Sequence, residues 1–151
     1  MEIKIKKLNV NAITPTYAKA GDACCDVTAI SYEYDKEHDL HVYHTGLAFE
    51  IPEGHCLKIF PRSSNTKTDC YLPNSVGVLD SGYRGELIIK YKERGFTKLL
   101  SFITRKPHKP YEVGDRVAQI QVQPYPVMEF VVVEKLSETE RGANGFGHTG
   151  K

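Results

Sequence analysis

The segment from Leu72 to Glu86 contains the residues whose types and spacing are best suited to chemistry. Asp80 ends an apolar stretch and begins a tight Ser-Gly turn, and Tyr83 follows that turn. A carboxylate beside a turn could act as a general base if it faced a pocket, with Tyr83 as a flat wall at the pocket edge. Asp-Ser-Gly is also ordinary turn chemistry, and a tyrosine is an ordinary strand residue. This segment alone leaves a catalytic and a purely structural interpretation open.

Two other segments carry groups that suit phosphate oxygens. Arg62, Ser63 and Ser64 follow Pro61 and offer a guanidinium, two hydroxyls and free backbone amides. Gln119 lies near the start of a strand-like stretch and can donate hydrogen bonds through its amide. A solvated Ser-rich turn and the polar face of a strand would explain the same residues without any ligand.

The remaining candidates lie near the two ends of the chain. Asp26 follows a small-residue loop, where its carboxylate could hold a water of hydrated Mg²⁺ or could simply accept hydrogen bonds from loop amides. The tail from Arg141 to Gly150 combines a guanidinium and the ring of Phe146 with glycines, which let backbone amides approach a phosphate closely. Phe146 could stack on a base, although a frayed terminus is the simpler interpretation.

Short strands are expected to position these segments. Apolar and polar residues alternate with a period of two along most of the chain, with Gly and Pro between the stretches, which predicts a sandwich, barrel or jelly roll. The β-branched run 127–133 predicts a strand buried on both faces, and 99–103 is another apolar stretch. Only 62–67 is expected to hold a short helix. Residues 104–112, which contain two prolines, are expected to form a surface loop.

Composition places the chain among single-domain globular proteins. It has 151 residues, 40% hydrophobic and 26% charged, which excludes disorder throughout. A net charge of +1 argues against nonspecific binding to nucleic acid or acidic membranes. The longest apolar run, 130–133, is far too short to span a bilayer, and the N-terminal residues contain no apolar signal core. We therefore expect no nucleic-acid or membrane partner, and a cytoplasmic protein with reduced cysteines.

In order and content, the five segments resemble the five motifs of the trimeric dUTPase family, dUTP diphosphatases with a jelly-roll fold. The resemblance runs from about Ala18 to Gly150. Its most specific motifs are GVLDSGYRGE at 77–86 and RGANGFGHTG at 141–150. A chance match of all five motifs in order is very improbable, although each motif alone is only a hypothesis.

The resemblance implies an all-β fold of the jelly-roll or distorted β-barrel type, with little helix and a flexible C-terminal tail. Residues 1–136 would form a single jelly-roll domain, and residues 137–151 a flexible arm that carries the fifth motif. The stretch 94–111 is longer than is usual in the family.

The resemblance also implies a role for each candidate residue. Asp80 matches the residue that orients and deprotonates the attacking water, and Tyr83 matches the one that packs on deoxyribose. Asp26 matches the carboxylate near the waters of the metal. The other nucleoside contacts would be Asn74, Gly77, Val78, Leu79, Ile88 and Phe146. The phosphate contacts would be Arg62, Ser63, Ser64, Gln119, Arg141, Gly147, His148 and Thr149.

The implied reaction is hydrolysis of dUTP to dUMP and pyrophosphate, by in-line attack of the activated water on the α-phosphorus of a triphosphate that carries Mg²⁺. The implied assembly is a homotrimer with active sites shared between subunits. Such an enzyme would work in the cytoplasm, in the host-cell cytoplasm if it is viral, and also in the nucleus if it is eukaryotic.

Two alternatives stay open. A dCTP deaminase shares the fold, but its family has a catalytic Glu where this chain has Lys90, so deamination is disfavoured. A nonenzymatic, nucleotide-binding regulatory jelly roll would bind nucleotide without turnover. The presence of Asp80 and of the complete fifth motif argues against it.

Overall fold

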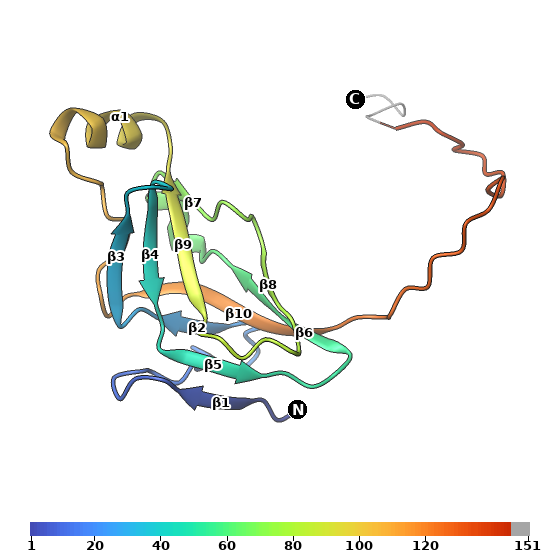
Figure 1. The fold of residues 1–151 in the computed structure, drawn as a ribbon, viewed down its shortest axis with the longest axis horizontal. Coiled ribbons are helices and arrows are strands. Elements are labelled where there is room, and N and C mark those ends of the chain that lie inside the picture. Colours follow the sequence, from blue (N-terminus) through green and yellow to red (C-terminus); the bar gives the residue numbers. More distant parts are fainter. Residues whose placement is uncertain (146–151) are drawn as a thin grey trace.

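The computed structural model describes residues 1–145 and consists mostly of short strands. The chain forms two four-stranded sheets, ordered β2-β10-β6-β8 and β3-β4-β9-β7, and β1 pairs with β5 (Figure 1). The elements are β1 (Lys4–Lys7), β2 (Cys25–Thr28), β3 (Ser31–Asp35), β4 (Leu40–His44), β5 (Leu47–Glu50), β6 (His55–Phe60), the 3-10 helix η1 (Ser63–Lys67), β7 (Cys70–Tyr71), β8 (Gly77–Leu79), β9 (Ile88–Glu93), the helix α1 (Gly95–Thr104) and β10 (Arg116–Pro124). The expected all-β fold with little helix is confirmed.

Both four-stranded sheets contribute to one apolar core. Val27 and Val117 come from one sheet and Tyr43 and Tyr91 from the other, and all four are fully buried. The Tyr91 hydroxyl donates a hydrogen bond of 2.8 Å to the Val117 carbonyl oxygen, so a buried polar group links β9 to β10. Buried hydroxyls need such partners, and this one also fixes how the two sheets sit on each other.

The strand β10 forms the centre of the sheet that carries most candidate site residues. It pairs antiparallel with β2 on one side and with β6 on the other. Its register with β2 shifts between Arg116 and Ala118, which is the signature of a bulge, and bulges turn a side chain to a new direction. The chain leaves β6 at Pro61, which cannot donate to the ladder, and enters η1. The short helix expected there is confirmed.

The stretch 99–103, expected to be strand-like, lies in the helix α1, so that interpretation was wrong. Its apolar residues follow Phe96 at helical intervals, at Leu99, Leu100 and Ile103. The loop expected at 104–112 begins where α1 ends, with Arg105 in a left-handed conformation. Neither helix of the described residues is long and apolar enough to cross a membrane.

The expectation of a buried strand at 127–133 is also wrong for the single chain. The ladder of β10 ends at Pro124, and Val132 is 98% exposed. Pro124 and Pro126 interrupt strand pairing at this point. The described residues beyond β10 extend away from the body (Figure 1), so no part of residues 1–145 covers the β-branched side chains.

Candidate active site

The candidate phosphate-binding residues meet where β2, β10 and β6 lie side by side. Gln119 of β10 lies opposite Asp26 of β2 and opposite Phe60 of β6. Arg62 follows Phe60 by two residues at the entrance to η1. The Gln119 amide nitrogen donates a hydrogen bond of 2.9 Å to the carbonyl oxygen of Pro61, which ties β10 to this turn. Residues from three distant parts of the sequence are thereby brought to one place.

Asp26 holds two guanidinium groups in position. Its Oδ1 accepts a hydrogen bond of 2.7 Å from Arg62 Nε, and its Oδ2 accepts one of 2.9 Å from Arg116 Nη1. Arg62 Nη1 also donates to Ser64 Oγ at 3.3 Å. Charge-assisted hydrogen bonds of this kind are short and directional, so the carboxylate sets the direction of both cations. The resulting group of Asp26, Arg62, Ser64, Arg116 and Gln119 is called the phosphate cluster below.

Arg116 is a member of this cluster that sequence reasoning missed. Its side chain is about half exposed, and the bulge at the start of β10 turns it toward Asp26. A guanidinium has five donors, and the cluster uses only one on Arg116. The remaining donors can therefore bind an anion. The signal in the sequence was a cation three residues before Gln119, but only the bulge brings it to the cluster.

A small cavity lies between β8, β9 and the loop before β8. It has a volume of about 210 Å³ and brings together Asn74, Gly77 and Ile88, three of the expected nucleoside contacts. A Cβ atom at Gly77 would lie 2.8 Å from Ile59 Cδ1 and 3.3 Å from Asn74 Nδ2, so only glycine allows this close approach. The cavity is smaller than typical pockets for drug-sized ligands, which suits a single small ring. Lys90 also lines it.

Residues 77–86, which comprise β8 and the turns that follow it, are called the hairpin segment below, or the hairpin for short. Its other two residues expected at the nucleoside contribute differently. Val78 is exposed, whereas Leu79 packs against the core and lies opposite Leu57 of β6. Neither of them lines the cavity, which is bounded on this side by the backbone at Gly77. Recognition by the hairpin would therefore rest on backbone groups, which cannot rotate away from a ligand.

Asp80 lies exposed just after β8, in the turn that the sequence predicted. The Tyr83 amide donates a hydrogen bond of 3.1 Å to the Asp80 carbonyl oxygen. This bond closes the turn through the backbone and does not involve the Asp80 carboxylate. The Tyr83 hydroxyl donates to the carbonyl oxygen of Glu86 at 3.2 Å. A Cβ atom at Gly85 would overlap the Tyr83 hydroxyl, so the tyrosine ring rests directly on the Gly85 backbone.

Asp80 and the phosphate cluster do not meet within one chain. In the β6–β8 ladder, Gly77 pairs with Ile59 and Leu79 pairs with Leu57, so continuing the register puts Asp80 level with Cys56. Arg62 lies beyond the other end of β6. Six residues of extended chain separate these two levels, which corresponds to roughly 20 Å. The structure therefore divides the expected site into two parts, the hairpin with its cavity and the phosphate cluster.

The described part of the tail, 137–145, makes no hydrogen bond or ion pair with either part in the single chain. Arg141 Nε donates a local hydrogen bond of 2.9 Å to the Asn144 carbonyl oxygen, and the segment that carries it extends away from the sheets (Figure 1). Ser63 is exposed at the start of η1, beside the cluster. Four expected site residues lie outside the described residues, and these are Phe146, Gly147, His148 and Thr149.

Comparison with known proteins shows the family of this chain. The dUTPase family model matches residues 10–150. The deoxyuridine 5'-triphosphate nucleotidohydrolase of Nautilia profundicola is 36% identical over 154 aligned positions and covers all of both chains. That of Helicobacter pylori strain J99 is 34% identical, with 99% of this chain and 97% of the relative covered. This chain belongs to the dUTPase family and is an enzyme of that family.

Solved structures are similar over the whole length. The Staphylococcus bacteriophage 80alpha dUTPase with dUPNHPP superposes with a TM-score of 0.79 at 26% identity, with 99% of each chain covered. The dUTPase from phage phi11 of S. aureus gives a TM-score of 0.70 at 23% identity, over 92% of this chain and all of the other. The second of these similarities concerns the fold alone.

Proposed function

We propose that this protein hydrolyses dUTP to dUMP and pyrophosphate. The observation that supports this most directly is the segment 77–86, where a small cavity bounded by the Gly77 backbone lies on one side and the exposed Asp80 carboxylate follows the same strand. A cavity of about 210 Å³ admits a pyrimidine ring. Backbone donors and acceptors can select uracil, and a close backbone wall at Gly77 leaves no room for the methyl group of thymine.

In the proposed reaction, Asp80 accepts a proton from the attacking water as the oxygen of that water bonds to the α-phosphorus. The bond from this phosphorus to the bridging oxygen breaks, and pyrophosphate leaves. Negative charge is spread over the phosphate oxygens in such transfers, so positioning and electrostatic stabilisation do most of the work. The donors of Arg62, Ser64, Arg116 and Gln119 would bind those oxygens, and Tyr83 would pack against the sugar.

The phosphate cluster suits a Mg²⁺ ion that is bound to the triphosphate of the substrate. No group of three or more metal-ligating side chains exists among residues 1–145, so phosphate oxygens and waters would supply most of the ligands of the ion. Asp26 uses three of its roughly four acceptor positions on Arg62 and Arg116, which leaves one for a metal-bound water. When bound, Mg²⁺ supplies positive charge that neutralises the phosphate oxygens.

We further propose a homotrimer whose active sites are shared between subunits. A distance of roughly 20 Å along β6 prevents one dUTP from contacting Asp80 and Arg62 of the same chain at the same phosphate. A second subunit that brings its phosphate cluster to the hairpin of the first removes this difficulty. The exposed β-branched side chains at 127–133 support the same idea, because another subunit can cover them.

The test is pyrophosphate release from dUTP, dTTP, dCTP and UTP, measured side by side with and without Mg²⁺. We expect release from dUTP alone, and only with Mg²⁺. Ammonia from dCTP would instead establish the deaminase, and tight dUTP binding without any product would establish the regulatory alternative. Lys90 at the cavity argues against the deaminase, which needs a carboxylate there.

A further inference from the structure

The helix α1 is oriented with its apolar face away from the protein. It stands apart from the sheets beyond the end of β9 (Figure 1), and none of its residues is buried. The two half-buried residues of α1 are polar, Thr97 and Ser101, whereas Phe96 is 74% and Phe102 82% exposed. The other exposed apolar side chains of the helix are Leu99, Leu100 and Ile103. An amphipathic helix normally buries its apolar face, and α1 does the opposite.

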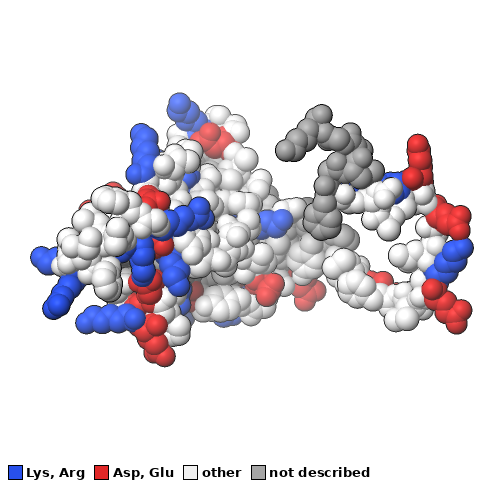
Figure 2. Space-filling view, turned by 90° about the horizontal axis from the view of Figure 1, so that it is seen from above, with Lys and Arg blue, Asp and Glu red and all other residues white. Residues whose placement is uncertain are grey.

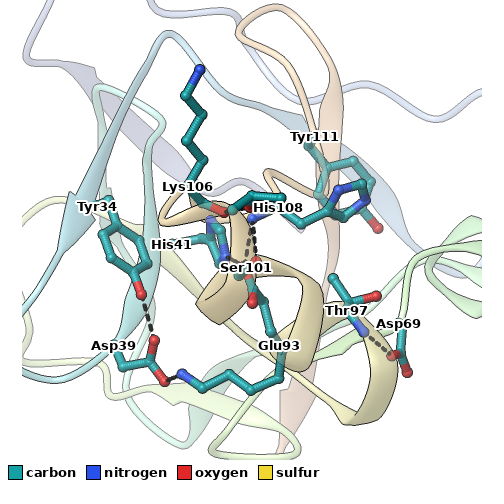
Figure 3. A network of polar contacts seen from close by, with 12 residues as sticks. Tyr34, Asp39, His41, Asp69, Glu93, Thr97, Ser101, Lys106, His108 and Tyr111 are labelled. Atoms are coloured by element: carbon teal, nitrogen blue, oxygen red, sulfur yellow. Dashed lines mark hydrogen bonds and ion pairs between the residues drawn. The ribbon is translucent and has the colours of Figure 1, made fainter.

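Specific polar contacts hold the helix in this orientation (Figure 3). The Thr97 amide donates to Asp69 Oδ2 at 3.3 Å, and Lys98 forms an ion pair with Asp39. On the next turn, Ser101 Oγ accepts a hydrogen bond of 2.9 Å from the His108 amide. The first two contacts join α1 to distant parts of the chain, and the third joins it to the segment that follows the helix, so the outward direction of the apolar face is built into the structure.

A buried pair beneath α1 anchors the same segment. Glu93 Oε1 accepts hydrogen bonds of 2.6 Å from the His108 amide and of 3.0 Å from His41 Nε2. His41 is fully buried and Glu93 nearly so, which makes this connection rigid. The chain before α1 and the chain after it are therefore both attached to the core, as Figure 3 shows.

Positive charge borders the apolar face. The segment 94–109 contains five Lys or Arg residues and no Asp or Glu, which is a quarter of the 20 basic residues of the chain. Lys98 and Lys109 are paired with Asp39 and Glu112, so the net charge of this border comes mainly from Arg94, Arg105 and Lys106. Figure 2 shows Lys and Arg side chains around uncharged atoms at the end of the molecule where α1 lies.

We propose that the outward face of α1 is a docking surface for another protein, whose contact region is an apolar face bordered by Asp and Glu. Exposed apolar patches with a polar rim mark interaction sites, and complementary charge at the rim fixes the partner. A second copy of this chain would bring the same cations together, so α1 does not pair with itself. The helix is about 15 Å long, so it offers a smaller contact area than a standard protein–protein interface. We therefore expect a transient complex.

The test uses two synthetic amphipathic helices of equal length, both with a leucine face, one bordered by Glu and the other by Lys. Binding is measured by fluorescence anisotropy with the full chain, with the variant Leu99→Ser/Ile103→Ser, and with the control Val10→Ser/Ile13→Ser. The control removes apolar side chains that are likewise more than half exposed but lie far from α1 in the sequence. Pyrophosphate release from dUTP and circular dichroism check that both variants keep their fold.

We expect saturable binding of the Glu-bordered helix at micromolar concentration, reduced about tenfold or more in the α1 variant and unchanged in the control. The Lys-bordered helix binds about tenfold more weakly. Equal binding of both helices, equal binding by both variants, or no binding at all would overturn the proposal. The proposal would also be overturned if the chain bound vesicles that contain phosphatidylserine more tightly than it bound the Glu-bordered helix. It would equally be overturned if the chain self-associated and only the α1 variant lost that self-association.

Discussion

Asp80 and Arg62 lie beyond opposite ends of the paired strands β6 and β8. The register of this ladder, with Gly77 opposite Ile59 and Leu79 opposite Leu57, sets the separation. The proposed base and the main phosphate-binding cation are thus held apart by rigid sheet rather than by a movable loop. A catalytic group must be within hydrogen-bond reach of its proton, which is why we propose that each site combines residues of two chains.

Replacing Asp80 by Asn tests the proposed general base. The amide cannot accept the proton from water, so kcat is expected to fall by about 10²–10⁴-fold while dUTP binding is retained. Pyrophosphate release gives kcat, and calorimetric titration with a nonhydrolysable dUTP analogue gives affinity. Glu53→Gln, an equally exposed carboxylate in a turn, serves as the control. Near-normal turnover by Asp80→Asn would remove this residue from the mechanism.

Gly85→Ala tests whether the position of Tyr83 matters for the sugar. The added Cβ would overlap the Tyr83 hydroxyl and displace the ring from the hairpin. We expect the preference for dUTP over UTP, measured as the ratio of kcat/KM values, to fall by about tenfold, which corresponds to about 1.4 kcal/mol. Gly82→Ala is a matched control, because a Cβ there meets no atom within 4 Å. Unchanged discrimination in Gly85→Ala would contradict this role.

Arg116→Ala tests the cation that sequence reasoning missed. Loss of its free donors should raise KM for dUTP by about tenfold, because a hydrogen bond to a charged group contributes about 1.5–3 kcal/mol. Deoxyuridine carries no phosphate, so its binding should not change. The Asp26–Arg62 contact at 2.7 Å does not depend on Arg116, and the fold should therefore persist. An equal loss of deoxyuridine affinity would indicate a general structural effect instead.

The buried His41 predicts a specific pH dependence of stability. Burial lowers the pKa of His41 below its ordinary value of 6.5, although Glu93 opposes this shift. In the unfolded chain His41 therefore binds a proton more readily than in the folded one, and stability falls as the pH drops below about 6.5. Urea denaturation at several pH values should show this slope, and His41→Gln should reduce it.

His55 provides the control for that measurement, since it lies half-buried at the start of β6 without a carboxylate partner among the described residues. The same urea series on His55→Gln shows what replacing a half-buried histidine outside the His41–Glu93 pair does to the slope. If both variants kept the same slope as the original chain, the assignment of this pH dependence to His41 would be wrong.

The local conformation around Asp80 and Arg62 could be predicted from the sequence, and the structure shows why. The turn after Asp80 and the Arg62–Ser64 turn depend on short-range chemistry, which spacing reveals. Arg116 and the separation of Asp80 from Arg62 depend on strand register and on a bulge, which pair residues far apart in sequence. No local pattern contains that information.

The two errors in secondary structure have a common physical cause. The apolar stretch at 99–103 was interpreted as strand-like and the run at 127–133 as a buried strand, yet the apolar side chains of both are exposed. In α1 the polar face contacts the body, and at 127–133 no segment of residues 1–145 lies opposite. Apolar patterning predicts that a surface is to be covered, but not whether the same chain covers it.

Mixing two inactive variants tests shared sites most directly. Asp80→Asn and Arg62→Ala are refolded together, and pyrophosphate release from dUTP is measured. If the two residues of each site come from different subunits, half of the subunits carry each intact residue, and random assembly restores about a quarter of the original activity. Arg62→Ala mixed with Gln119→Ala is the control and stays inactive, because both residues belong to the phosphate cluster of one chain. A mixture of Asp80→Asn and Arg62→Ala that remains as inactive as its parents would contradict the account.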